Sequence, residues 1–307
     1  MTHSDLHVLT IGTDDGVRLA ATRLGRSASA ATLVYIHALG RERGFWSPLA
    51  GRVHQQLSGA VTQIVYDQRG HGESGKPAPR QITTLRRLAE DLDTVLAHAS
   101  GQVVLVAHST AAQLVYAYAT IHREPADRLA GLVLFNATSE SLALPRYLHT
   151  WPKRLIWFRR HRSLDAVTAA GEAILKYRLG RTGHLFAPNA GADPRVIIDI
   201  LGTHPGFGLH VKAAEALSRI PAVVLAGERD TVVPLQHAVG LADVLRADYD
   251  IVAGAGHHLP APISYAPPTP SPPSSTTPCA TTSNAQPTHR RTNGGGREVN
   301  PISVPSR

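Results

Sequence analysis

The sequence predicts an α/β protein built on a mostly parallel central sheet with flanking helices. Short apolar runs, rich in β-branched residues, alternate along the chain with segments that carry apolar residues at helical spacing. These runs end in loops of small and polar residues, and the carboxyl ends of parallel strands meet at one edge of a sheet. The loop after the run Val103–Ala107 holds a single serine, Ser109, directly before an apolar segment of helical character. We therefore expect the functional residues to lie at this edge of the sheet.

The first two strands are expected to pair as an antiparallel hairpin. The runs 6–11 and 17–24 are joined by Asp14-Asp15-Gly16, and an Asp-Gly pair between two strands is typical of a hairpin turn. After this hairpin, strands and helices alternate. Further strands are expected at 32–36, 62–66, 103–107, 132–135, 220–225 and 248–252, and helices at 45–57, 82–97, 113–121 and 236–245.

Two segments interrupt this alternation. Residues 139–219 form a long insertion with helical patches and no clear strand, so we separate them from a core made of residues 1–138 and 220–258. Residues 259–307 hold eleven of the 22 prolines, many Ser and Thr, and a run of three glycines. Such a segment buries too little apolar surface to fold. The sequence therefore predicts a disordered C-terminal tail over 259–307.

Composition narrows the function classes. The net charge of +8 fits nucleic acid or anionic membrane, but the Arg residues are spread along the chain without a nucleic-acid motif, so we expect no nucleic-acid partner. The one cysteine, Cys279, lies in the tail, which excludes an intramolecular disulfide and a cysteine metal site. No apolar run has the roughly 18 residues of a membrane span, and the first nine residues lack a signal peptide's apolar stretch. We expect a cytoplasmic protein without stable membrane insertion; its oligomeric state stays open.

Ser109 stands where a buried strand turns sharply into a helix. Such a turn pushes the hydroxyl clear of the sheet, beside the N–H groups and the positive dipole end of the helix. The arrangement is the nucleophile elbow, whose usual pattern is Gly-x-Ser-x-Gly; here Ala107 and Ala111 replace both glycines. A serine that only caps the following helix is the alternative interpretation.

Asp230 and His257 follow later strands that end at the same edge. A serine hydroxyl is a weak nucleophile until a base takes its proton, and an imidazole can act as that base near neutral pH. A carboxylate on the other ring nitrogen fixes the tautomer. The chain order Ser109, Asp230, His257 is the one expected for this kind of sheet. Two alternatives stay open: Asp230 as a turn residue only, and His258 as the base, although the preceding Gly-x-Gly favours His257.

Taken together, these loops resemble those of the α/β-hydrolase fold family, in its serine hydrolase branch with a helical cap, over about residues 6–258. The resemblance rests on five loops: His37-Ala38-Leu39-Gly40, Asp67-x-Arg-Gly-His-Gly-x-Ser74, the serine turn, Gly227-x-x-Asp230, and Gly254-x-Gly256-His257. It implies an α/β-hydrolase fold in which the backbone N–H groups of Leu39 and Thr110 form the oxyanion hole. Such donors stabilise the negative oxygen that develops during acyl transfer.

Three sites depart from the pattern of the family. Ala38 stands where the family usually has Gly, which narrows the approach of the substrate oxygen. Asn136 follows a strand where some relatives carry the acid, and since an amide does not serve as a carboxylate, Asp230 keeps that role. Pro260 and Pro262 replace the start of the helix that relatives place after the catalytic histidine.

Three further histidines, His37, His71 and His108, also stand at strand ends. We expect them to make structural hydrogen bonds, because their spacing does not match that of a metal site. The sequence therefore predicts neither a metal nor a cofactor.

The insertion 139–219 fits a helical cap over the strand ends. Its apolar side chains, among them Trp151, Trp157 and Phe158, are candidates for lining a substrate pocket. Six Lys or Arg and no acid lie between 146 and 162, which fits an acidic acyl or phosphate group of a substrate, or contact with anionic lipid. A solvated basic face of an amphipathic helix is the interpretation we favour.

These features predict a serine hydrolase that cleaves an ester-like or thioester-like carbonyl bond of a small-molecule acyl substrate through an acyl-serine intermediate. A serine at the turn argues against relatives that open epoxides or displace halide, which use Asp there. An acyltransferase or a cofactor-free perhydrolase on the same triad is one alternative. A non-catalytic ligand-binding member of the family is the other. The sequence does not name the substrate, because a fold does not fix a function.

Overall fold

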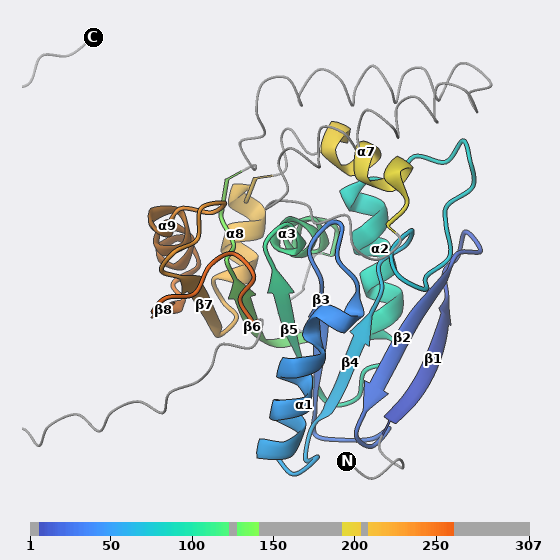
Figure 1. Ribbon diagram of the computed structural model, residues 1–307, viewed down its shortest axis with the longest axis horizontal. Helices are drawn as coiled ribbons and strands as arrows, with labels where there is room; N and C mark the ends of the chain where they lie inside the picture. Colours follow the sequence, from blue (N-terminus) through green and yellow to red (C-terminus); the bar gives the residue numbers. More distant parts are fainter. Residues whose placement is uncertain (1–5, 123–127, 141–191, 204–207, 261–307) are drawn as a thin grey trace, which may run out of the picture. The chain divides into compact units, whose positions relative to one another are not determined.

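The computed structural model describes residues 6–122, 128–140, 192–203 and 208–260. Within these ranges, eight strands form one sheet in the order β1-β2-β4-β3-β5-β6-β7-β8 (Figure 1). The strands are β1 (Leu6–Gly12), β2 (Arg18–Leu24), β3 (Ala31–Ile36), β4 (Thr62–Tyr66), β5 (Gln102–His108), β6 (Leu129–Phe135), β7 (Ala222–Gly227) and β8 (Asp248–Val252). The helices are α1 (Ser47–Gln56), α2 (Leu85–Leu96), α3 (Ala111–Ile121), α7 (Pro194–Thr203), α8 (Val211–Leu217) and α9 (Leu235–Leu245), with a 3₁₀ turn, η2 (Arg43–Trp46), before α1.

Parallel pairing dominates the sheet, as predicted. β1 and β2 form the antiparallel hairpin that the Asp-Gly turn indicates, β2 pairs antiparallel with β4, and the later pairs are parallel. β3 lies between β4 and β5, so the chain leaves β3 toward one side of the sheet and later returns to the other side. The loops after β3 and β5 therefore diverge at a switch point, where open parallel sheets bind their ligands.

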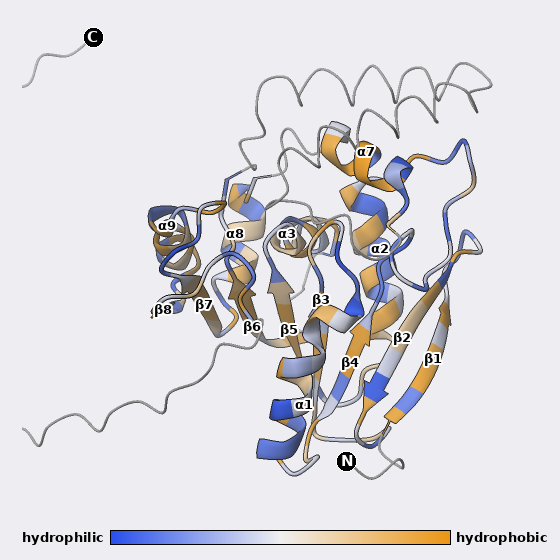
Figure 2. Cartoon of the chain, viewed as in Figure 1, coloured by the Kyte–Doolittle hydropathy of each residue, from blue (hydrophilic) through white to orange (hydrophobic). Residues whose placement is uncertain are grey.

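Helices cover both faces of the sheet. Apolar side chains of α2, α3, α8 and α9 join alternate strand residues such as Leu105 in one large cluster. On the other face, Trp46 of η2 lies in a second cluster with Tyr35 and Val106. Because both faces are buried, the middle strands are continuous apolar runs, which Figure 2 shows for β5 and β6. None of the helices in the described ranges has the length and apolar content that crossing a bilayer requires.

Helices α7 and α8 lie inside the range 139–219 that was expected to form the cap. Leu217 of α8 and Ile200 of α7 are buried in the large cluster together with residues of the sheet. α8 also packs against α3. These two helices are therefore joined to the core by apolar packing, whereas residues 141–191 lie outside the described residues.

The end of the described chain follows the edge strand β8. Tyr249 and Ile251 of this strand are 52% and 39% exposed, which are high values for large apolar residues. Leu259, at the start of the predicted tail, is 6% exposed and packs in the second cluster. The rest of that predicted tail, from residue 261 on, lies outside the described residues.

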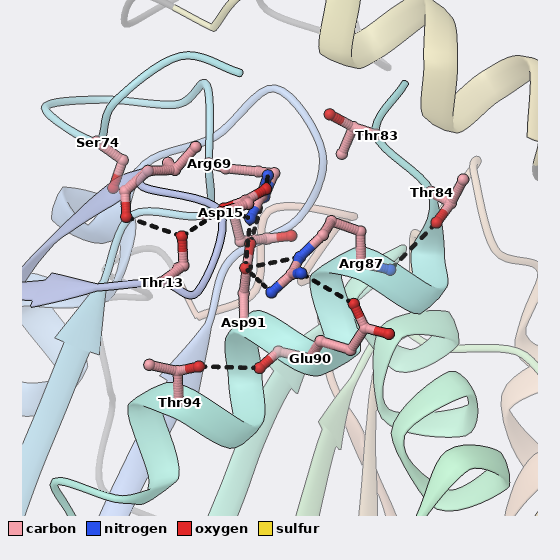
Figure 3. Close-up of polar contacts among 12 residues, drawn as sticks. Thr13, Asp15, Arg69, Ser74, Thr83, Thr84, Arg87, Glu90, Asp91 and Thr94 are labelled. Carbon is pink, nitrogen blue, oxygen red and sulfur yellow. Dashed lines mark hydrogen bonds and ion pairs between the residues drawn. The ribbon is translucent and has the colours of Figure 1, made fainter. Parts of the chain in front are cut away.

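A buried ion-pair network fixes the 67–74 loop against α2 and the first hairpin (Figure 3). The Arg69 side chain is fully buried and donates to both carboxylate oxygens of Asp91, at 2.5 and 2.6 Å, and to Asp15 at 2.7 Å. Arg87 adds a second cation to Asp91 at 3.2 Å. The hydrogen bond from Arg69 holds the pKa of Asp15 well below its usual range. Since a buried charge is tolerated only when it is paired, these contacts hold the loop in one position.

Candidate active site

Ser109 lies in a strained turn between β5 and α3. Its φ of +53° falls in the left-handed region, which is unfavourable for any residue with a Cβ atom. The backbone stabilises the turn, because the Ser109 N–H donates to the Phe135 carbonyl at 2.9 Å and the Ser109 carbonyl accepts from the Ala112 N–H at 3.0 Å. The residue that caps α3 is Thr110, and its side chain makes no capping hydrogen bond. The interpretation of Ser109 as an ordinary helix cap is therefore wrong.

Small side chains on both sides of this turn permit the close passage of strand and helix. Ala107 and Ala111 are 0% and 2% exposed. Both lie in the large apolar cluster between sheet and helices. A methyl group therefore fits at both places where the usual motif has glycine.

Asp230 and His257 are brought together by the loops after β7 and β8. The His257 Nδ1 donates to the Asp230 Oδ2 at 2.8 Å, and the two side chains are 10% and 1% exposed. The other carboxylate oxygen of Asp230 accepts the N–H groups of Val232 and Val233, at 2.7 and 2.9 Å. Asp230 therefore stabilises a turn with one oxygen and orients an imidazole with the other. With Nδ1 as the donor, Nε2 carries the lone pair that a general base needs.

The His257 loop is tied to the strands beside it through a carbonyl. The His257 carbonyl accepts from His108 Nε2 at 2.7 Å and from the Asn136 side-chain amide at 2.9 Å. The Asn136 side-chain oxygen accepts the Gly227 N–H at 2.8 Å, which joins the same loop to the end of β7. His108 directly precedes Ser109, and its ring centroid lies 5.1 Å from that of His257. His108, the residue before Ser109, thus contacts the His257 loop across this edge of the sheet.

The rival histidine, His258, has a different partner. Its ring nitrogens lie 3.0 and 3.3 Å from the Arg41 guanidinium. Arg41 itself lies over the ring of Phe45, at 5.8 Å from its centroid. Burial and the positive charge of Arg41 lower the pKa of His258. The carboxylate of Asp230 bonds the ring of His257, and this geometry favours His257 over His258 as the base.

Two buried histidines fix the loop after β3. His37 accepts the Gln68 N–H on Nε2 at 3.0 Å and donates from Nδ1 to the Ala38 carbonyl at 2.9 Å. His71 accepts the Gly40 N–H on Nε2 at 3.1 Å and donates from Nδ1 to the Arg69 carbonyl at 3.0 Å. Each ring needs an unprotonated nitrogen to accept from an N–H. Burial lowers the pKa of both rings, that of His37 to about 3, with the charge of His71 as a further cause.

Because these histidines are buried and unprotonated, we expect the stability of the folded state to fall at low pH. The pKa of His37 is lower in the folded state, about 3, than its ordinary value of 6.5, so the unfolded chain binds the proton more readily. Its contribution to stability is complete above pH 6.5 and is lost as the pH falls toward 3. The free energy of unfolding, measured by urea titration, is expected to fall by up to about 1.4 kcal/mol per pH unit from this group.

The variant His37→Gln removes this titration, and its unfolding free energy is expected to depend less steeply on pH between 6.5 and 4. His98→Gln, at an exposed position, is the matched control. Equal slopes for wild type and His37→Gln would contradict the prediction.

Leu39 and Thr110, which were predicted to supply the two backbone donors of an oxyanion hole, contact each other directly. The Leu39 N–H donates to Thr110 Oγ1 at 2.7 Å. This hydrogen bond joins the loop after β3 to the residue that follows Ser109. In this structure the Leu39 N–H therefore has a hydroxyl of the chain itself as its acceptor.

The remaining predictions concern a substrate pocket, a basic stretch and a metal site. Trp151, Trp157 and Phe158, the candidates for a substrate pocket, lie outside the described residues, as does the basic stretch 146–162. Within the ranges that the structure describes, no three His, Cys, Asp or Glu side chains come together in a way that would hold a metal ion.

Sequence reasoning missed two parts of this site. Asn136 was weighed only as a possible acid, whereas its amide links the ends of β6 and β7 to the His257 loop; it adopts a φ of +48° that suits a sharp bend after a strand. The hydroxyl of Thr110 was also missed. The signal that was available for it is a hydroxyl-bearing residue directly after the serine.

Comparisons with known proteins agree with this fold. A model described as the alpha/beta hydrolase family matches residues 33–264 of the chain. No curated protein matches the sequence closely enough to count as a relative.

Several solved structures share the fold at low sequence identity. A thermophilic esterase from Thermogutta terrifontis has a TM-score of 0.58 and 20% identity, over 82% of this chain and 92% of that one. The thioesterase domain from the curacin biosynthetic pathway has a TM-score of 0.59 and 17% identity, over 83% and 94%. The enol-lactonase from Burkholderia xenovorans LB400 has a TM-score of 0.56 and 20% identity, over 81% and 93%. At these identities the likeness concerns the fold.

Proposed function

The chain belongs to the alpha/beta hydrolase family, and within it we propose a serine hydrolase that cleaves an ester-like or thioester-like carbonyl bond through an acyl-serine intermediate. One observation carries the proposal: the strained turn at Ser109 and the hydrogen-bonded pair of His257 and Asp230 lie on neighbouring loops at one edge of the sheet. A serine, a base and a carboxylate that orients the base are the three parts that nucleophilic acyl transfer needs.

In the proposed reaction, Ser109 Oγ attacks the carbonyl carbon of the substrate while His257 Nε2 takes the hydroxyl proton. Asp230 accepts the Nδ1–H and stabilises the imidazolium that forms. The alcohol or thiol then leaves with the proton from His257. A water molecule attacks the acyl-serine with His257 again as the base, which releases the acid and restores the Ser109 hydroxyl.

The Ser109 turn lies at the N-terminus of α3, and this position supports the oxyanion part of the proposal. Backbone N–H groups and the positive end of the helix dipole stabilise negative charge there. The Thr110 N–H is the donor nearest to the nucleophile in the sequence. His37 and His71 hold the loop that carries Leu39 in a fixed position beside this turn.

Hydrolysis of p-nitrophenyl esters with graded acyl length tests this proposal. We expect turnover that begins with a burst of about one p-nitrophenolate per protein molecule, because acylation precedes hydrolysis of the acyl-serine. The dependence on acyl length measures which acyl groups the site accepts. Tight binding of these esters without turnover would contradict the hydrolase and support a ligand-binding protein.

A further inference from the structure

The contact between Leu39 and Thr110 changes how an oxyanion would be bound. A backbone N–H has one hydrogen, and that of Leu39 is directed at Thr110 Oγ1 over 2.7 Å. A substrate oxygen that approached the Leu39 N–H would therefore meet the Thr110 hydroxyl first. Either this hydroxyl leaves during the reaction, or it takes part in binding the negative oxygen.

The loop that carries Leu39 is held from both sides, so its N–H does not turn away freely. The Arg41 N–H donates back to the Ala38 carbonyl at 3.0 Å, and the next N–H in the loop, that of Gly40, is bonded to His71. Leu39 is only 7% exposed and packs in the large apolar cluster. The direction of the Leu39 N–H is therefore fixed toward Thr110.

The Thr110 hydroxyl is able to donate a hydrogen bond. A hydroxyl accepts with two lone pairs and donates one hydrogen. Its lone pair takes the Leu39 N–H, and no other side-chain hydrogen bond of Thr110 occurs within the described residues. The β-branched side chain restricts χ1, so the oxygen stays beside the serine turn in the absence of a capping bond.

We infer that the Thr110 hydroxyl is itself an oxyanion donor, which accepts from the Leu39 N–H and donates its own hydrogen to the substrate oxygen. The inference rests on the proposed acyl-serine function. Leu39 then acts through the hydroxyl, and the Thr110 N–H is the second direct donor. A hydrogen bond from a hydroxyl to an anionic oxygen is short and strong, and a donor that also accepts a hydrogen bond is polarised further.

The variant Thr110→Val tests the inference because it keeps the β-branched shape and removes the hydroxyl. Loss of one oxyanion donor lowers kcat by about 10² to 10³-fold. We expect such a loss in Thr110→Val with little change in KM, since the oxyanion exists in the transition state and not in the bound ester. Thr110→Ser, which keeps the hydroxyl, is expected to recover most of this loss.

The alternative is that the Thr110 hydroxyl merely occupies the Leu39 N–H and does not bind the substrate. This alternative predicts no loss of kcat when the hydroxyl is removed. Its removal would free that N–H for the substrate, so kcat of Thr110→Val would equal or exceed that of the wild type, and this result would overturn the inference. A boronic acid, which forms a tetrahedral adduct with a serine, gives a second measurement. Its affinity is expected to fall in Thr110→Val in parallel with kcat; an unchanged affinity would contradict the donor role.

Labelling with a fluorophosphonate separates the inference from the function on which it rests. Labelling of wild-type Ser109 together with undiminished kcat in Thr110→Val would refute the inference, whereas the proposed hydrolase function would still stand. Failure of the wild type to react with both the fluorophosphonate and the esters would remove both. Thermal unfolding of each variant shows whether a loss of rate reflects a loss of folded protein.

Discussion

Replacement of Ser109 by alanine is expected to lower the rate of ester hydrolysis by at least about 10³-fold, because the side-chain hydroxyl that forms the acyl-serine is then missing. The fold is expected to persist. Alanine has the same backbone preferences as serine at the φ of +53°, and the bonds that hold the turn come from the backbone. Purified variant and wild type are compared by p-nitrophenyl ester hydrolysis and by thermal unfolding.

Ser58→Ala is the matched control for this variant. Ser58 also has a positive φ, +49°, but it is exposed and follows α1, away from the candidate site. Its replacement is expected to leave ester hydrolysis at the wild-type rate. Wild-type turnover in Ser109→Ala would exclude Ser109 as the nucleophile.

Replacement of His257 by alanine is expected to reduce ester hydrolysis by about 10³-fold or more, because the serine hydroxyl loses its base. The neighbouring His258→Ala is expected to keep most of the activity, since the ring of His258 contacts Arg41 whereas Asp230 bonds His257. The two variants differ by one position and remove the same side chain. Steady-state kcat for both variants decides between the two histidines, and a loss confined to His258→Ala would show that the base has been assigned to the wrong residue.

The fold was predictable because its strands are buried on both faces. Runs such as Val103–Ala107 and 132–135 are continuous and apolar, which in an α/β sequence indicates a parallel strand, and the Asp-Gly turn indicates the hairpin. Boundaries were less predictable. The helix expected over 82–97 begins at Leu85 instead, where Thr84 accepts the Arg87 N–H as its cap, and the preceding residues run as a loop.

Only those features of the candidate site that depend on where a loop lies in the sheet were predictable from the sequence. Ser109, Asp230 and His257 follow strand ends, so the topology alone gathers them at one edge. The Leu39–Thr110 bond was not predictable, because it joins residues 71 positions apart and depends on side-chain direction. The same holds for the anchoring of His257 by His108, across 149 positions. Such contacts arise from packing between loops, which no local pattern records.

Fluorophosphonate labelling of the native protein, followed by mass mapping of the adduct, tests the central claim most directly. The Ser109 oxygen attacks phosphorus, fluoride leaves, and His257 takes the proton, so the probe reacts with a serine that a base activates. The account predicts one adduct per molecule, on Ser109, and none after denaturation of the protein. A native protein that forms no adduct, or that forms it on another serine, would contradict the account.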